Sequence, residues 1–182
     1  MGDREVPRTS GARPCHHGRM RIPDLGRDGQ GWVVLQIVFI IAIAVAGVPD
    51  PAWDGPIGVG TNAFGAACIV VGGLLVILGS RALGPSFSPN PRPVPGGRLV
   101  QGGIYAGVRH PIYGGVILCG FGWGLFAASP LALVLVAALV VLFVLKSLRE
   151  EAWLSEHYPG YDEYRRGTNR FFPPLLRRKA RP

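Results

Sequence analysis

Four long apolar runs without any charged side chain constrain the fold of this chain more than any other feature. They cover residues 32–48, 57–78, 112–128 and 131–145 of a 182-residue sequence. Each is within or just below the roughly 17–25 residues that cross a bilayer as a helix. Buried helices of a soluble bundle would carry polar stripes instead. The runs therefore predict an all-α, polytopic integral membrane protein with four transmembrane helices, at about 32–48, 57–78, 111–128 and 131–149.

The basic side chains gather in three segments outside these runs. Segments 1–31, 80–111 and 146–182 contain six, four and nine Lys and Arg residues, which are all nineteen of the chain. Because cytoplasmic loops of membrane proteins are enriched in Lys and Arg, both termini and the 81–111 loop are predicted to lie in the cytoplasm. Seventeen Arg against two Lys is typical of GC-rich bacterial genomes, so a bacterial cell membrane is the expected location.

The charge pattern also divides the chain into a membrane domain and two tails. Residues 1–31 are rich in Arg, Gly and Pro without apolar periodicity, which predicts a disordered basic tail. Residues 32–174 form the predicted membrane domain, and 175–182 form a basic tail expected to touch anionic headgroups. The expected partner is the lipid bilayer and not nucleic acid, and the oligomeric state is left open. The three cysteines lack a CxxC spacing, so no metal site is predicted.

Glycines recur within the second and third runs. They stand at positions 58, 60, 65, 72 and 73, and again at 120 and 124. Glycines here would either mark a passage for a ligand or let two helices pack closely, and close packing is the favoured interpretation. The loop at 81–108 has five prolines and is either disordered or functional. We expect it to form an ordered cap over the membrane mouth.

A polar, glycine-rich segment precedes the third apolar run and ends in Arg109-His110-Pro111. Proline is favoured in the first turn of a helix, so Pro111 predicts a helix start. The free backbone N–H groups and the positive dipole end at a helix start favour an anion. A cationic pair at this position is therefore the first indication of a ligand site.

Ser129-Pro130 separates the third and fourth runs by a tight turn, which predicts an antiparallel hairpin. The distance along the chain from Arg109 to this turn is about the same as from the turn to Glu150, at ~1.5 Å per helical residue. Glu150 and Glu151 are therefore expected to return to the same membrane face as Arg109 and His110. After them, Pro159-Gly160 is expected to end the fourth helix, and a short amphipathic helix with Tyr161 and Tyr164 follows.

Taken together, these motifs resemble the isoprenylcysteine carboxyl methyltransferase and phospholipid methyltransferase family. The likeness covers roughly residues 80–174 and includes the order and spacing of the motifs. They are Arg109-His110-Pro111-x-Tyr113-x-Gly115, Glu150-Glu151-x-x-Leu154, Tyr161-x-x-Tyr164 and Arg170-Phe171-x-Pro173. The resemblance implies an integral-membrane enzyme that uses S-adenosyl-L-methionine and methylates a lipophilic acceptor. Its cofactor pocket would be formed by the loop before the third helix, the ends of the hairpin and the C-terminal segment.

Carried over position by position, the resemblance implies specific roles. The implied cofactor-binding residues are Gly97, Leu99, Val100, Tyr105, Arg109, His110, Pro111, Ile112, Tyr113 and Glu150. The implied substrate-binding residues are Lys146, Arg149, Tyr161 and Tyr164, and the candidates for catalysis are His110, Glu151 and Arg149. In the carboxyl methyltransferases the residue at position 146 is arginine. Lysine keeps the charge but lacks the bidentate fork, and Arg149 could compensate.

Several interpretations remain open at this stage. The acceptor could be an isoprenylcysteine-like carboxylate, another lipid, an amine or a thiol, and an amine would need His110 or Glu151 as a base. Arg98, Arg109 and the two glutamates could instead be interfacial residues, and the two tyrosines could simply pack. The rival functions are an NADPH-dependent membrane reductase of the sterol type and a non-catalytic membrane protein that retains the fold.

Overall fold

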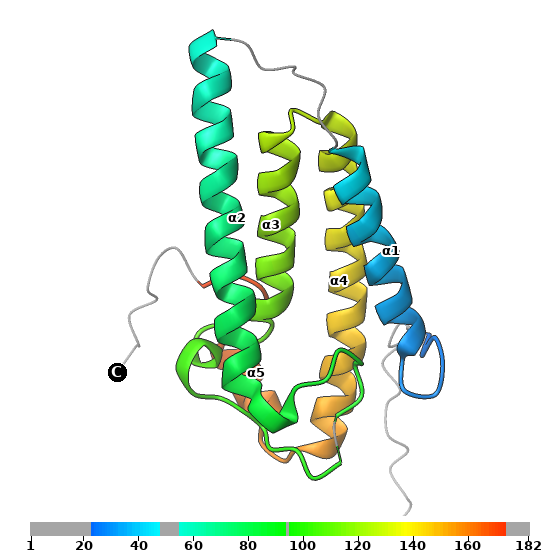
Figure 1. Ribbon diagram of the computed structural model, residues 1–182. Coiled ribbons are helices and arrows are strands. Elements are labelled where there is room, and N and C mark those ends of the chain that lie inside the picture. Colours follow the sequence, from blue (N-terminus) through cyan, green and yellow to red (C-terminus); the bar gives the residue numbers. More distant parts are fainter. Residues whose placement is uncertain (1–22, 48–54, 94, 174–182) are drawn as a thin grey trace, which may run out of the picture.

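The computed structural model describes residues 23–47, 55–93 and 95–173. Within these ranges the chain is helical and forms no strand. Four long helices run side by side, with α1 and α2 at opposite edges (Figure 1). Their bounds are Gln30–Ala46 for α1, Gly55–Leu83 for α2, Pro111–Phe126 for α3 and Pro130–His157 for α4. A short α5 (Tyr161–Gly167) and two 3-10 turns, Gly84–Ser86 and Gly103–Ala106, complete the described elements.

The long helices coincide with the apolar runs. Two of them, α2 and α4, are long and apolar enough to cross a membrane, whereas α1 and α3 are shorter apolar helices of 17 and 16 residues. The outer faces of α1 and α2 expose large apolar side chains; Val45 is 66% exposed and Val59 is 72% exposed. Extended apolar surfaces of this kind are typical of faces that contact a membrane or a partner. The all-helical architecture is therefore compatible with a membrane protein.

The predicted hairpin of α3 and α4 is confirmed. Pro111 begins α3, and the chain turns at Ala128, which has a positive φ of 51°. The Ser129 hydroxyl accepts a hydrogen bond from the backbone N–H of Ala132 at 3.2 Å and so caps α4. The same hydroxyl donates to the carbonyl of Ala46 at 2.7 Å. One side chain thus ties the end of α1 to the turn between α3 and α4.

Glycines allow α2 and α3 to pack backbone against backbone. A Cβ atom on Gly72 would lie 2.6 Å from the carbonyl oxygen of Gly115, and one on Gly115 would lie 2.6 Å from that of Gly72. Gly65 and Gly122 face each other in the same way, at 2.7 and 2.5 Å. The pairs are seven residues apart on both helices, so each heptad brings the same face into contact. Close packing, the favoured interpretation of the glycines, is confirmed for Gly65 and Gly72, whereas a Cβ on Gly60 or Gly73 would meet no atom within 4 Å.

The core lies on the other side of α3, between it, α1 and α4. Its buried members are apolar residues of these three helices: Trp32, Ile43, Ile117, Ala132, Val136, Leu139, Leu142 and Phe143. Tyr113 of α3 stacks on Phe143 of α4 with ring centroids 4.7 Å apart. Side chains of this size hold α3 and α4 farther apart than the glycines hold α2 and α3. Space for cavities is consequently found on the α1–α4 side of the bundle.

The loop between α2 and α3 gathers with α5 at one end of the bundle (Figure 1). The segment after α5 runs beside the start of α3, because the backbone N–H of Arg109 donates to Asn169 O and that of His110 donates to Arg170 O, both at 2.8 Å. The described loop residues make specific contacts, as expected for an ordered cap. Most of the predicted N-terminal tail, the connection at 48–54 and the C-terminal tail lie outside the described residues.

Candidate functional site

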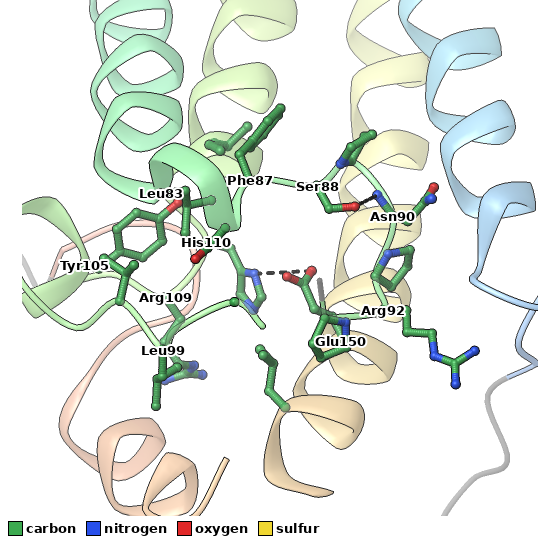
Figure 2. Close-up of a pocket in the computed structure, with 18 of the residues that line it drawn as sticks. Leu83, Phe87, Ser88, Asn90, Arg92, Leu99, Tyr105, Arg109, His110 and Glu150 are labelled. Carbon is green, nitrogen blue, oxygen red and sulfur yellow. Dashed lines mark hydrogen bonds and ion pairs between the residues drawn. The ribbon is translucent and has the colours of Figure 1, made fainter. Parts of the chain in front are cut away.

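A cavity opens at the α5 end of the bundle, beneath the loop that precedes α3 (Figure 2). Residues of α1, the end of α2, α3, α4, α5 and this loop line it. Its lining includes Gln36, Ser86–Pro93, Gly97–Val100, Tyr105, Arg109, His110, Ile112, Tyr113, Lys146, Glu150, Leu154, Tyr158, Tyr161 and Tyr164. The cavity lies at the level where the apolar runs of the long helices end and charged side chains begin.

His110 and Glu150 lie beside each other in the lining of this cavity. His110 lies directly before α3 and Glu150 lies on α4, with His110 Nδ1 3.7 Å from Glu150 Oε2 (Figure 2). The Tyr113 hydroxyl donates to the same carboxylate oxygen at 2.7 Å. The imidazole stacks on the Tyr113 ring, with centroids 5.2 Å apart and planes within 2°. Tyr113, in the first turn of α3, therefore holds both the Glu150 carboxylate and the plane of the His110 imidazole.

Glu151 has a different environment from its neighbour Glu150. Its side chain is 2% exposed, and its carboxylate is 3.1 Å from Arg109 Nε, 3.2 Å from His110 Nε2 and 3.4 Å from an Arg170 guanidinium nitrogen. Burial raises the pKa of this carboxyl group, but the hydrogen bond and charge of His110 and the charges of Arg109 and Arg170 outweigh it. They hold the pKa at about 2. Glu151 thus remains ionised inside a cluster of cations.

The Arg109 guanidinium is turned toward the C-terminal segment. Besides Glu151 it donates to the carbonyl oxygen of Arg165 at 2.8 Å and to that of Thr168. These bonds use a large part of its donor capacity within the protein. Arg109 borders the cavity, but its main contacts tie the start of α3 to the segment after α5.

Lys146 is a buried cation on α4, one helical turn before Glu150, and it lines the same cavity. It is 1% exposed, and its Nζ donates to Gln36 Oε1 at 2.7 Å and to the Pro89 carbonyl at 3.0 Å. The Nζ atom lies 5.1 Å from the centre of the Tyr113 ring. The α1 helix and the proline-rich loop are therefore joined at the cavity by one lysine.

Tyrosines form much of the remaining wall. The Tyr164 hydroxyl donates to the Tyr105 carbonyl at 2.6 Å, and the Tyr158 hydroxyl donates to the Gly97 carbonyl at 2.9 Å. The Tyr161 hydroxyl is buried and has no hydrogen-bond partner among the described residues. Burial raises the pKa of Tyr161, with Glu151 and Glu150 adding to the effect, so this group is a neutral donor at pH 7. A buried hydroxyl without a partner is an unusual feature of a folded protein.

The sequence pattern of the phospholipid methyltransferase family matches residues 61–160. The chain belongs to this family. Membership implies a methyltransferase in general terms and agrees with the apolar helices in indicating a membrane protein. No curated protein sequence matches the chain significantly. The matched region contains all of α3 and α4 and most of α2, and so includes His110, Lys146 and both glutamates.

The structure of this family member brings most of the predicted site residues to one cavity. Nine of the ten implied cofactor-binding residues line it, the exception being Pro111, whose ring begins α3. Lys146, Tyr161 and Tyr164 also line it. Arg149 and Glu151 do not.

Arg149 extends away from the cavity toward the N-terminal segment. Its Nε pairs with Asp24, and its guanidinium lies 4.4 Å from the centre of the Trp153 ring. The N-terminal segment also contacts the loop, since Arg92 pairs with Asp28 at 3.0 Å. Residues 23–29, which the composition assigned to a disordered tail, therefore lie against α4 and the loop.

Some cavity residues of this methyltransferase were not predicted from the sequence. Gln36 lies on α1, outside the region that carries the family resemblance, and the stretch 86–93 was treated only as a cap. A signal for Gln36 exists, because it is the only polar residue within the first apolar run. Polar side chains inside a membrane-spanning run are costly and typically mark functional positions.

Proposed function

We propose that the chain is an S-adenosyl-L-methionine-dependent methyltransferase that acts on a lipophilic acceptor at the cytoplasmic face of the membrane. The observation that carries this proposal is the pairing of His110 and Glu150 in the lining of a cavity at the end of the apolar helices. Family membership supports a methyltransferase over the reductase considered as a rival. All four long helices would span the bilayer, with both termini and the cavity on the cytoplasmic side, as the distribution of Lys and Arg favours.

The residues of the cavity fit S-adenosyl-L-methionine. This cofactor has hydroxyl and amino groups that suit the Glu150 carboxylate, and polar atoms that could accept from the unpartnered Tyr161 hydroxyl. The flat rings of Tyr105 and Tyr113 offer surfaces for adenine or for the sulfonium cation. Gly97, Leu99, Val100, His110 and Ile112 would complete the pocket. When bound, the cofactor supplies an electrophilic methyl group.

The protein's own residues would mainly position the acceptor and exclude water. Lys146 lines the cavity beside Glu150 and is the candidate contact for the acceptor. Tyr164 closes the pocket through its bond to the Tyr105 carbonyl. We assign Glu151 a positioning role, because it holds Arg109 and His110 in place from outside the cavity lining. The direction of Arg149 favours a role in anchoring the N-terminal segment.

The test of this function uses S-adenosyl-L-methionine that carries a label in its methyl group and measures where the label is transferred. Membranes containing the full chain are expected to incorporate label into an extractable lipophilic product. Glu150→Gln should reduce incorporation strongly because it removes the charge that the site places beside the cofactor. Glu156→Gln, an exposed position on the same helix, is the matched control and should retain activity. Incorporation equal to that of membranes without the protein would contradict the proposal, as would stabilisation of the purified protein by NADPH but not by S-adenosylhomocysteine.

A further inference from the structure

The proline-rich loop (residues 86–93) forms one wall of the cavity. Pro89, Pro91 and Arg92 belong to the cavity lining, and the Pro89 carbonyl accepts a hydrogen bond from Lys146 Nζ at 3.0 Å. Pro91 is fully buried. Prolines occupy three of the eight positions of this loop. Because the ring of proline fixes φ, the loop is stiff, and we expect it to move as one unit.

The N-terminal segment (residues 23–29) packs against this loop. A Cβ atom on Gly29 would lie 2.9 Å from Pro91 Cδ and 3.5 Å from Trp153 Cη2, so the backbone of Gly29 contacts both side chains. Gly29 has a positive φ of 76°, which glycine adopts without a steric penalty. Pro91 therefore contacts the N-terminal segment and also lines the cavity.

Two ion pairs connect the N-terminal segment to the loop and to α4. Asp28 Oδ1 lies 3.0 Å from Arg92 Nη1 on the loop, and Asp24 pairs with Arg149 on α4. The Arg92 side chain extends away from His110 and toward the α1 side of the site (Figure 2). The loop is consequently attached to α4 through the N-terminal segment as well as through its contacts inside the cavity.

The N-terminal segment is held firmly at α1 but only weakly at the loop and α4. Trp32 of α1, a member of the core that is 3% exposed, donates from Nε1 to the Pro23 carbonyl at 3.2 Å. The side chains of Asp24 and Asp28, in contrast, are 54% and 45% exposed. Exposed ion pairs contribute little to stability and are screened by salt. These two pairs can therefore break and re-form while the helices stay packed.

We propose that the N-terminal segment is an ionic latch, which holds the proline-rich loop closed over the cavity and opens it for ligand exchange when the two ion pairs break. The identity of the exchanging ligand, S-adenosyl-L-methionine, rests on the proposed function, whereas the latch itself does not. Asp24 and Asp28 precede the region that matches the family, residues 61–160. The latch is therefore an addition of this chain to the part that the family pattern describes.

Amide hydrogen exchange of residues 86–93 tests the latch without any ligand, because exchange reports local opening. In the purified full chain in detergent, the loop should exchange about threefold or more faster at about 0.5 M salt than at about 0.05 M. Asp24→Asn/Asp28→Asn should exchange fast at both salt concentrations. Glu156→Gln/Glu163→Gln, which changes the net charge equally at exposed positions, is the control and should behave as wild type. Equal exchange in wild type and the Asp24→Asn/Asp28→Asn variant, or no response of wild type to salt, would overturn the proposal.

Substitution of Gly29 tests the contact with the loop independently of charge. Gly29→Ala would bring a methyl group against Pro91, so it should separate the N-terminal segment from the loop and speed up exchange of the loop amides. Gly160→Ala is the matched control, because Gly160 also has a positive φ, of 91°, but a Cβ there would meet no atom within 4 Å. This control should leave loop exchange at the wild-type rate. Equal loop exchange in the two variants would contradict the contact on which the latch depends.

The kinetics of S-adenosylhomocysteine exchange test whether the latch controls access to the cavity. Labelled S-adenosylhomocysteine should dissociate about threefold or more faster from Asp24→Asn/Asp28→Asn than from wild type, and it should also associate faster. Kd should therefore change less than either rate. Unchanged rates in this variant would overturn the proposal. Absence of binding to the folded wild-type protein would instead contradict the proposed function, and loop exchange would still decide whether the latch exists.

Discussion

At the end of the bundle that holds the site, the two faces of α3 are built in opposite ways. Toward α2 it presents glycines, and the two backbones approach until a Cβ would lie 2.6 Å from a carbonyl oxygen. Toward α4, the start of α3 presents Tyr113 and the preceding His110, which contact Glu150 and Glu151 directly beside the cavity. Close packing fixes α3 along one side without leaving space. The side chains on the other side line the cavity to which the proposed function assigns the ligands.

The largest expected effect on stability comes from removing the Glu151 carboxylate from the charged cluster beside α3. Glu151→Ala would leave Arg109, His110 and Arg170 without their shared anion, and loss of one partner of a buried ion pair costs about 3–5 kcal/mol. We expect a corresponding fall in the free energy of unfolding, measured by thermal or denaturant unfolding in detergent. The exposed Glu156→Ala is the control and should change stability little. Equal stability of the two variants would contradict the role assigned to Glu151.

Acid should weaken the same cluster. Because the pKa of Glu151 is lowered from 4.5 to about 2, its contribution is present above pH 4.5 and is lost as the pH falls toward 2. The shift corresponds to about 3 kcal/mol. Unfolding measured between pH 5 and 2 should therefore show a loss of stability in wild type that is smaller in Glu151→Gln. Parallel pH profiles for the two proteins would argue against this assignment.

Adjacent glycines of α2 provide a sharp test of the close-packed side. Gly72→Ala would place a methyl group against the Gly115 carbonyl and the Cys119 sulfur, and overpacking of this kind costs about 1–3 kcal/mol. Gly73→Ala meets no atom within 4 Å, and it should stabilise the helix by up to about 1 kcal/mol. Melting temperatures in detergent would show the opposite signs. A similar change in both variants would mean that α2 and α3 do not meet at Gly72.

The smallest expected effect on stability comes from removing the hydrogen bond between Tyr113 and Glu150. Tyr113→Phe keeps the ring that stacks on His110 and Phe143 but removes the 2.7 Å hydrogen bond to the carboxylate. A hydrogen bond to a charged group contributes about 1.5–3 kcal/mol, and we expect a loss at the lower end of this range. Tyr158→Phe, which removes a bond to a neutral carbonyl, should cost less. The reverse order in unfolding experiments would count against a charged Glu150.

The sequence contained the local signals for most of the bundle and for one wall of the site. Pro111 and Ser129-Pro130 were enough to predict the α3–α4 hairpin, and the hairpin places Glu150 and Glu151 opposite His110. The sequence did not show that Gln36 lines the site, because the position of α1 beside α4 depends on packing between side chains that are far apart in the sequence. Arg149 was assigned to the site because it could compensate for the lysine at position 146. Successive helical residues differ by about 100° in direction, and Arg149 extends toward Asp24 instead.

Binding of S-adenosylhomocysteine to the purified full chain tests the central claim most directly. Isothermal titration of the wild-type protein is expected to show saturable binding at one site, strongly weakened by Glu150→Ala and unaffected by the exposed control Glu156→Ala. This pattern would place the cofactor beside Glu150 in the cavity. Absence of binding to the folded wild-type protein, or equal binding by wild type and Glu150→Ala, would contradict the account.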